Sequence, residues 1–304
     1  MKKFWKNASF RLKFGLICTL FFLILGFVVF FIPHADPFPN AIMEKNLPPR
    51  IPGIEKLGIL NGMENGVMKY KGATENVYHF LGTTSQGQDI FWLLIEGIHN
   101  SLTIGLIVAL IGTVVGVFVG LLSGFVGGGL DRFLMLVTDT FVVIPSLPVM
   151  ILMTALMKGR ATVIMMALVL AMFAWAWPSR QIRSMALSMK ERDFIHTAWF
   201  SGEGVVQTVV TEILPFTLTW SLSNFMNATL SAIASESGLA VLGLSPANLI
   251  TLGNMIQWAR NYNAIIMGRW NWILPPILST IILFVGLFML ITGYNDYTAM
   301  KRGR

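Results

Sequence analysis

Six long apolar runs alternate with more polar segments along this chain. The first run, residues 15–32, reads GLICTLFFLILGFVVFFI and is about as long as a helix that spans a bilayer. The other runs contain a few polar residues each, but they are also long enough to cross a membrane as helices. They cover residues 97–125, 131–157, 161–178, 212–236 and 272–294. The pattern predicts an all-α membrane protein with six transmembrane helices.

Basic residues precede the first run, as they do in a cleaved signal peptide. However, the run is long for the apolar part of a signal peptide, and no cleavage site made of small residues follows it. Pro33, His34 and Asp36 follow instead. We therefore expect an uncleaved helix, so that residues 1–32 comprise the N-terminus and the first transmembrane helix.

The distribution of basic residues predicts the orientation. With six crossings, 13 of the 22 Lys and Arg residues fall on the N-terminal side of the membrane, and only 4 fall in the short segments opposite. Lys and Arg are enriched in cytoplasmic loops. We therefore expect cytoplasmic N- and C-termini, and a cytoplasmic location for the loop 179–211.

The polar segments suggest four divisions of the chain. Residues 33–95 are mixed in polarity, rich in Pro, Gly and Asn, and contain no span, which indicates a long extracytoplasmic loop after the first helix. The division at 96–296 contains the remaining helices, and residues 297–304 form a short cytoplasmic tail. Residues 1–32 are the first division.

Composition supports membrane insertion. Charged residues make up 12% of the chain and hydrophobic residues 55%, whereas a soluble domain has about 25% charged residues. The net charge of +7 does not indicate nucleic-acid binding, because the basic residues lie at the ends of apolar runs and form no single patch. The single cysteine, Cys18, lies inside an apolar run and has no partner for an intrachain disulfide.

Four glycines occur at four-residue intervals in the second predicted span. Gly112, Gly116, Gly120 and Gly124 therefore share one helix face. Small residues let a second helix approach closely within lipid. We expect this face to pack inside the subunit, and a seam between two subunits is the alternative.

The fifth predicted span has a polar stripe. At 100° per residue its members fall within an arc of about 120°. They are Thr217, Ser221, Asn224, Asn227, Ser231 and Ser235. Asparagine side chains are costly against lipid, so the stripe faces either neighbouring helices or a wet translocation path. Glu236, at the outer end, is either functional or part of a structural ion pair.

The loop 179–211 is too long for a plain turn. Phe194, Ile195 and Ala198 predict a short helix with an apolar side, and no cytoplasmic domain of this chain is available to bury it. The lipid surface and a separate protein partner are the two candidates for covering that side. Gly202 would let the chain turn back toward the next span.

Enzyme chemistry is not indicated. The four histidines have no spacing that suggests a metal site or a nucleophile pair, and the chain contains neither a P-loop nor a dinucleotide-binding fingerprint. We expect no catalytic residues, no bound metal and no cofactor on this chain. Trp175 and Trp177 are expected at headgroup depth, where tryptophan is enriched, and this location explains them without a binding site.

Residues 191–215, ERDFIHTAWFSGEGVVQTVVTEILP, resemble the EAA motif of permease subunits of binding-protein-dependent ABC importers. His196-Thr197-Ala198, Gly202 and Ile213-Leu214-Pro215 carry the motif, with His196 in the place of its glutamate. The blocks 81–106, 124–151, 177–198 and 236–245 are similar to the peptide/nickel type of these permeases.

The resemblance implies a type I ABC importer (MetI-like) fold in the plasma (inner) membrane of a prokaryote. It implies three kinds of partner besides lipid: a homologous second permease subunit, two cytoplasmic ATPases that carry ATP and Mg, and an external solute-binding protein. The loop helix would be the coupling helix, seated in an ATPase groove that buries Phe194, Ile195 and Ala198. The coupling residues would be Arg192, Asp193, Phe194, Ile195, His196, Thr197, Ala198, Gly202, Leu214 and Pro215.

Two substrate classes remain open. The family average favours oligopeptides, whereas the block 252–276 is similar to members that accompany oligosaccharide utilisation, including that of β-linked glucans. The polar stripe and Glu236 would belong to the translocation path. A membrane scaffold or signalling protein that docks a cytoplasmic partner through residues 191–215 is the alternative function.

Overall fold

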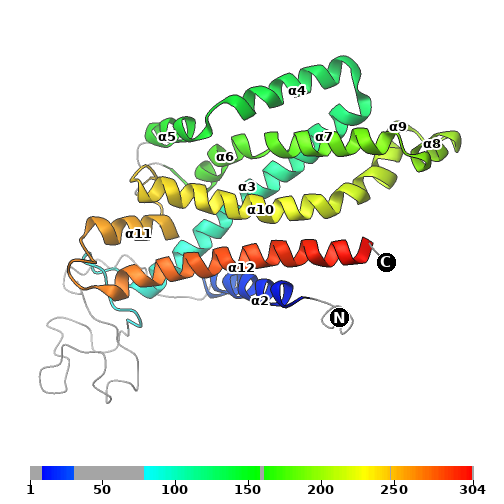
Figure 1. Cartoon of the computed structure of the whole chain (residues 1–304). Helices are drawn as coiled ribbons and strands as arrows, with labels where there is room; N and C mark the ends of the chain where they lie inside the picture. Colours follow the sequence, from blue (N-terminus) through cyan, green and yellow to red (C-terminus); the bar gives the residue numbers. More distant parts are fainter. Residues whose placement is uncertain (1–8, 31–78, 158–160, 247, 303–304) are drawn as a thin grey trace, which may run out of the picture.

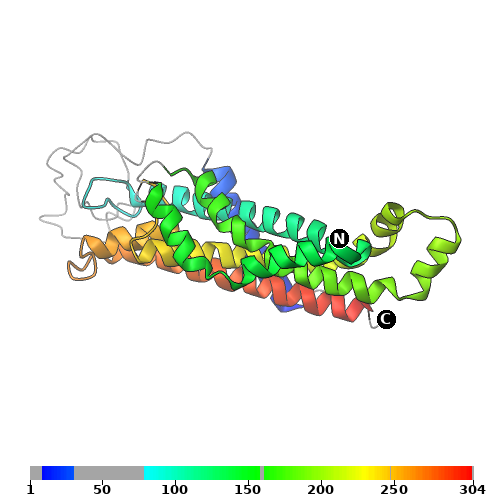
Figure 2. The same cartoon turned by 90° about the horizontal axis from the view of Figure 1, so that it is seen from above.

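The computed structural model describes residues 9–30, 79–157, 161–246 and 248–302. Within these ranges every regular element is a helix, and an isolated bridge between Thr83 and Asp89 is the only β-structure. The predicted all-α fold is confirmed for this part of the chain. The helices form an elongated bundle, beyond one end of which α8 and α9 project (Figure 1 and Figure 2). The elements are α2 (Phe10–Ile24), η1 (Leu25–Val29), α3 (Ile90–Val126), α4 (Gly128–Val143), α5 (Ser146–Leu156), α6 (Val163–Ala174), α7 (Ala176–Lys190), α8 (Asp193–Phe200), α9 (Val205–Thr208), η3 (Val209–Ile213), α10 (Leu214–Val241), α11 (Leu252–Asn261) and α12 (Trp270–Arg302).

Three helical stretches are long and apolar enough to cross a membrane: Phe10–Val29, Ile90–Val126 and Trp270–Met300. The bent pairs α4 with α5 and α6 with α7 also pass this test when each pair is taken together. The described residues therefore contain three candidate spans, or five if each bent pair counts as one. The fifth predicted span, which corresponds to α10, is not among them, and the count of six stays a prediction.

Two of the predicted elements differ from the structure. The run 131–157 is not one straight helix, because α4 and α5 meet at 78° around Pro145. The residue before a proline is disfavoured in the α conformation, and Ile144 is extended, with ψ 123°. The run 161–178 bends by 41° between α6 and α7, and α7 continues to Lys190. The segment predicted as a loop from residue 179 is therefore helical over its first twelve residues.

The glycine stripe packs α3 against α6 and α7, as predicted for packing inside one subunit. A Cβ atom added at Gly112 would lie 2.8 Å from the Cβ of Ala174, and one at Gly124 would lie 2.8 Å from the Cβ of Ala186. A Cβ atom at Gly120 would lie 2.6 Å from the carbonyl oxygen of Ser179. Real side chains do not tolerate such distances, so glycine permits this approach of the two helices.

Charged side chains tie α4 to α7. Arg183 donates two hydrogen bonds to Asp131, from Nε to Oδ1 at 2.6 Å and from Nη2 to Oδ2 at 2.7 Å. Arg180 Nε donates to Asp139 Oδ1 at 2.9 Å. Lys190 Nζ donates to the carbonyl oxygen of Phe125 at 2.9 Å, near the end of α3. These contacts hold α7 against α4 and against the end of α3.

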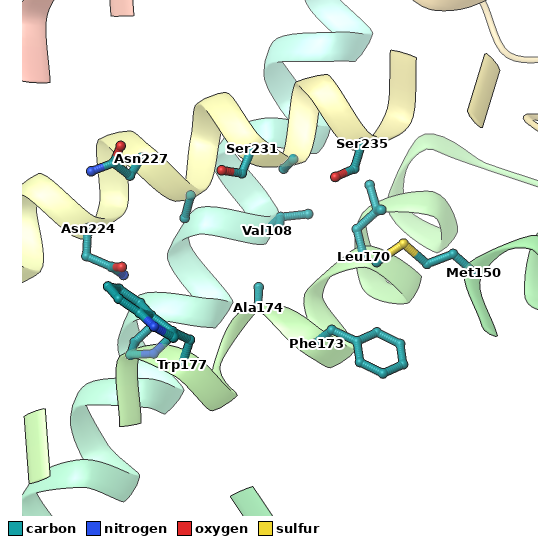
Figure 3. Close-up of a pocket in the computed structure, with 13 residues that line it drawn as sticks. Val108, Met150, Leu170, Phe173, Ala174, Trp177, Asn224, Asn227, Ser231 and Ser235 are labelled. Atoms are coloured by element: carbon teal, nitrogen blue, oxygen red, sulfur yellow. The ribbon is translucent and has the colours of Figure 1, made fainter. Parts of the chain in front are cut away.

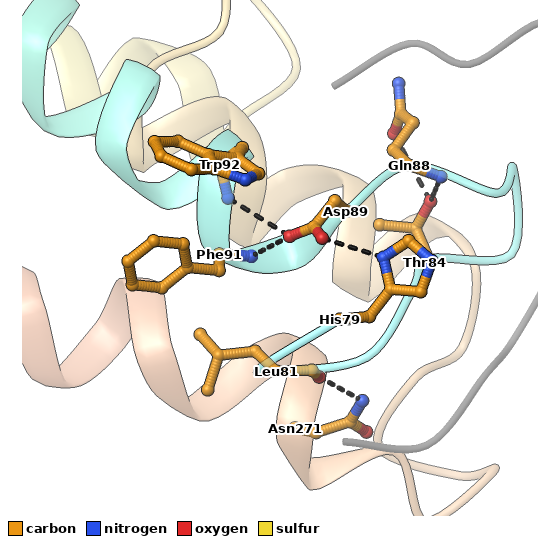
Figure 4. A network of polar contacts seen from close by, with 8 residues as sticks. All are labelled: His79, Leu81, Thr84, Gln88, Asp89, Phe91, Trp92 and Asn271. Atoms are coloured by element: carbon orange, nitrogen blue, oxygen red, sulfur yellow. Dashed lines mark hydrogen bonds and ion pairs between the residues drawn. The ribbon is translucent and has the colours of Figure 1, made fainter. Parts of the chain in front are cut away.

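A polar network sets the start of α3 (Figure 4). Asp89 Oδ1 accepts hydrogen bonds from backbone N–H groups in the first turn of α3, at 2.8 and 3.2 Å, and thus caps the helix. Its Oδ2 lies 2.7 Å from Nδ1 of the buried His79. Asn271, in the first turn of α12, donates to the carbonyl oxygen of Leu81 at 2.8 Å. The network therefore holds the entry segment against two helices.

Most of the predicted extracytoplasmic loop 33–95 lies outside the described residues. The structure describes residues 79–95 of it, and the last six of these already belong to α3. The second predicted span thus begins at residue 90 rather than at residue 97.

Candidate functional site

Part of the polar stripe on α10 lines a pocket of about 500 Å³. In Figure 3 the stripe residues follow one another along α10 and face side chains of α3, α5, α6 and α7. The stripe residues in this lining are Asn224, Asn227, Ser231 and Ser235. Val108, Met150, Leu170 and Phe173 give the opposite side an apolar character. Hydroxyl and amide groups therefore face an apolar wall.

A second pocket of about 430 Å³ continues along the same helix. It shares Trp177, Asn224 and Asn227 with the first pocket, so the two are adjacent. Thr219 lies at one end of the combined lining on α10 and Ser235 at the other, which corresponds to about 24 Å of helix. The remaining members of the second lining are Met185, Trp220, Ser223, Asn295, Thr298 and Ala299. The combined surface spans most of the hydrocarbon thickness of a bilayer, about 30 Å.

Hydrogen bonds fix the amides of this surface. Asn224 Nδ2 donates to Thr113 Oγ1 of α3 at 3.1 Å, and this asparagine is buried. Asn227 Nδ2 donates to the carbonyl oxygen of Ser223 one turn earlier at 3.2 Å, and its side chain is exposed. Ser223 Oγ donates to Asn295 Oδ1 of α12 at 2.6 Å. Asn224 thus contributes to helix packing as well as to the lining, and Asn227 presents its amide to the pocket.

Two stripe residues lie elsewhere. Thr217 is fully buried, and its hydroxyl donates to the carbonyl oxygen of Leu214 at 3.0 Å. Ser221 donates to the carbonyl oxygen of Thr217 at 2.9 Å and borders an apolar groove between α10 and α3. Both hydroxyls are satisfied by their own helix. The structure therefore brings four of the six stripe residues to the two pockets described above.

Glu236 also lies outside both linings. Its side chain is fully buried, and Oε1 accepts hydrogen bonds from Thr251 Oγ1 at 2.7 Å and from Ser245 Oγ at 3.4 Å. Thr251 in turn accepts from the backbone N–H of Asn254 at 3.2 Å and caps α11. Among the described residues the carboxyl group forms no ion pair. Glu236 thus joins the end of α10 to the loop that precedes α11.

The segment predicted for coupling contains α8, a short helix with two different sides. The buried side of α8 carries Ile195, with no exposed surface, and Ala198, with 9%. Ile195 packs in a cluster with Leu121 of α3, Ile182 of α7 and Ile213 of η3, and Phe194 is partly buried against the same cluster. The expectation that an ATPase groove buries Ile195 and Ala198 is therefore wrong, because this chain already buries both, and for the partly exposed Phe194 it stays a prediction. The extension of α7 and the end of α3 supply the apolar surface that the sequence pattern did not reveal.

The opposite side of α8 is exposed. Its side chains form two rows with four-residue spacing, and the rows lie next to each other on the same face of the helix. They are Arg192, Asp193, His196, Thr197 and Phe200. Phe200 is 93% exposed, which makes it a prominent apolar residue of this side. We call these five residues the α8 outer face. Phe200 was not among the residues predicted for coupling, although its spacing from His196 would have placed it there.

The glycine and proline of the motif shape both ends of the segment. Gly202 has φ +84°, and the backbone N–H of Glu203 donates to the carbonyl oxygen of Ala198 at 3.1 Å, which is the Schellman pattern that ends a helix. Pro215 lies in the first turn of α10 and lacks an N–H for the carbonyl four residues earlier. The π-helical segment η3 lies at that point. Leu214 packs against the cluster around Ile195.

Residues 112–301 match the family described as "Binding-protein-dependent transport system inner membrane component". This match covers more than half of the chain, and the chain therefore belongs to that family. The match includes α4 to α11 and nearly all of α12, and with them the α8 outer face and every residue of the α10 pockets except Val108. The resemblance derived from the EAA motif and the neighbouring blocks is confirmed.

Named relatives agree with this membership. The oligopeptide transport system permease protein OppC of Mycobacterium tuberculosis (strain ATCC 25618 / H37Rv) is 32% identical over 59% of this chain and 62% of its own length. The dipeptide transport system permease protein DppC of Lactococcus lactis subsp. cremoris (strain MG1363) is 30% identical over 84% of this chain and 77% of its own length. The nickel transport system permease protein NikC of Escherichia coli (strain K12) is 29% identical over 60% and 66%. The match thus spans less than two thirds of the length of the Mycobacterium tuberculosis OppC.

Proposed function

We propose that this chain is a permease subunit of an ATP-driven importer and forms half of a translocation path for short oligomers. The observation that carries the proposal is the combined pocket along α10, about 24 Å long and lined by amides and hydroxyls. Family membership supports it, as do the relatives named for oligopeptide, dipeptide and nickel transport. The oligomers are oligopeptides or oligosaccharides, delivered by an external solute-binding protein.

In this proposal α10 also crosses the plasma membrane, as the fifth of six crossings. The polar stripe gives α10 a lower mean hydropathy than the other spans. Polar side chains would be costly against lipid, but α10 is covered by α3 and α12 and, in the proposed complex, by the second permease subunit. Both termini are cytoplasmic, in agreement with the distribution of Lys and Arg. The second subunit, homologous to this one, supplies the other half of the path.

The α8 outer face is the surface that docks one of two cytoplasmic ATPases, which carry ATP and Mg. Phe200 provides an apolar anchor, and Arg192, Asp193 and His196 provide polar contacts around it. The buried side of α8 is packed against α3, α7 and η3. A displacement of α8 by the ATPase therefore reaches the helices that carry the pockets, because packed interiors transmit displacement.

The test is uptake by proteoliposomes that contain the whole complex: both permeases, both ATPases and the solute-binding protein. Cellotriose and trialanine serve as probes. Replacement of both Asn224 and Asn227 by leucine abolishes ATP-driven uptake while co-purification with the ATPase is retained. The matched control is Asn261→Leu, at an exposed position on α11 outside both linings. Wild-type complexes that assemble but take up neither probe would favour a scaffold or signalling role.

A further inference from the structure

We propose that the α10 pockets contain a stacking subsite, built by Trp177 and Trp220, that selects neutral polyhydroxylated oligomers, namely short oligosaccharides, over peptides. This inference rests on the proposed transport function and specifies its substrate class. Trp177 comes from α7 and Trp220 from α10, so the subsite lies where the two helices face each other.

The two indole rings are neighbours in the second pocket, where Trp220 is partly buried and Trp177 is exposed. Their centroids are 5.9 Å apart and their planes are inclined by 32°. Trp177 is 55% exposed and belongs to both linings, so a face of its ring is available to a solute in either pocket. A pyranose ring has flat patches of C–H groups that pack on such a surface, while its hydroxyl groups remain at the edge. Large rigid rings provide contact area at low entropic cost.

The polar groups beside the rings match hydroxyl groups. An asparagine side chain offers both a carbonyl acceptor and an amide donor, and a sugar hydroxyl both donates and accepts. The amide of Asn227 is exposed in both linings, and Asn295 is exposed in the second. Ser231 and Ser235 add hydroxyls along the first pocket. The aromatic surface thus has donors and acceptors along its edge.

The linings carry no charge. None of the residues that line the two pockets is Asp, Glu, Lys, Arg or His. A free peptide brings an ammonium and a carboxylate group, and transfer of an ionised group into a site without a counter-charge is expensive. A nickel ion likewise prefers imidazole or carboxylate ligands, which these linings lack. A neutral oligosaccharide encounters neither cost.

The experiment measures direct binding to the assembled permease–ATPase complex in nanodiscs without the solute-binding protein, so that its selectivity does not enter. Saturation-transfer NMR compares cellotriose with zwitterionic trialanine at equal concentration. We expect a signal for cellotriose at least fivefold larger than that for trialanine. Trp177→Leu reduces the cellotriose signal at least fivefold, and Trp177→Phe, which keeps an aromatic face, restores part of it. Trp270→Leu is the matched control, since Trp270 is also 55% exposed but lies outside both linings.

Three results would overturn the subsite: an equal or larger signal for trialanine, a cellotriose signal that Trp177→Leu leaves unchanged, and an equal loss in Trp270→Leu. ATP-driven uptake distinguishes failure of the subsite proposal from failure of the proposed transport function. Proteoliposomes that import trialanine but not cellotriose would retain the transport function and refute the oligosaccharide subsite. Complexes that import neither probe would refute both.

Discussion

The two sides of α8 make a prediction that separates anchoring from docking. Ile195 has no exposed surface and packs against α3, α7 and η3. Ile195→Ala removes three carbon atoms, each of which contributes about 0.8 kcal/mol of burial. With the cavity left behind, the expected cost is about 2–5 kcal/mol. Because α8 has only eight residues, this loss weakens the attachment of the whole helix.

Hydrogen exchange is the direct assay. Every 1.4 kcal/mol changes an equilibrium by about tenfold, so the local opening of α8 becomes about 30-fold or more favourable. Backbone amides of residues 193–200 therefore exchange at least about 30-fold faster in Ile195→Ala, as measured by mass spectrometry on the purified complex. ATP hydrolysis becomes uncoupled from uptake in the same variant, because the helix no longer transmits displacement.

Phe200→Ala is the matched comparison on the other side. Since Phe200 is 93% exposed, its removal costs at most about 0.5 kcal/mol of stability, and exchange in α8 stays near the wild-type rate in the free permease. Co-purification with the ATPase falls instead. Unchanged exchange in Ile195→Ala, together with faster exchange in Phe200→Ala, would show that the two sides of α8 are assigned the wrong way round.

Three further substitutions test local geometry through the thermal midpoint of the purified complex. Gly202→Ala places a side chain at φ +84° and costs about 1 kcal/mol of stability. Gly204→Ala lowers the midpoint less, because Gly204 has open space around it and no positive φ. Equal effects of the two substitutions would refute the helix-terminating role of Gly202. Gly120→Ala forces α3 away from Ser179 and lowers the midpoint. Gly129→Ala, in open space on α4, leaves the midpoint unchanged or raises it. A neutral Gly120→Ala would contradict the close approach of α3 to α7. Asp131→Asn breaks the bidentate pair with the partly buried Arg183. It lowers the midpoint more than Asp139→Asn, because the pair of Asp139 with Arg180 is more exposed. The reverse order of the two effects would refute this ranking.

The approximate positions of the long apolar helices could be predicted from the apolar runs, because lipid requires long hydrophobic stretches whatever their neighbours. The glycine stripe on α3 could also be interpreted from its spacing, and its packing partner proved to lie in the same subunit. The breaks at Pro145 and Trp175 could not be located in this way, since a bent pair and a straight helix have the same hydropathy.

The pockets show the limit of a single-helix pattern. Periodicity placed six polar residues on one face of α10, but packing leaves only part of that face open, and Thr217 is fully buried. Trp177, Trp220 and Asn295 belong to three different helices, and no spacing in the sequence connects them. For the same reason the burial of Ile195 within the chain required knowledge of where α7 ends.

In the proposed transport mechanism, the face of α10 around Asn227 borders a wet path whose accessibility changes during turnover. The single native cysteine makes a direct measurement possible, because Asn227→Cys can be studied in a Cys18→Ser background. Leu222→Cys, at a 51% exposed position on α10 outside both linings, is the control. We predict that a water-soluble maleimide modifies position 227 of the reconstituted complex, that ATP turnover changes this rate at least fivefold, and that position 222 reacts slowly throughout. Equal reactivity at the two positions, or a rate at position 227 that ATP does not alter, would contradict the account.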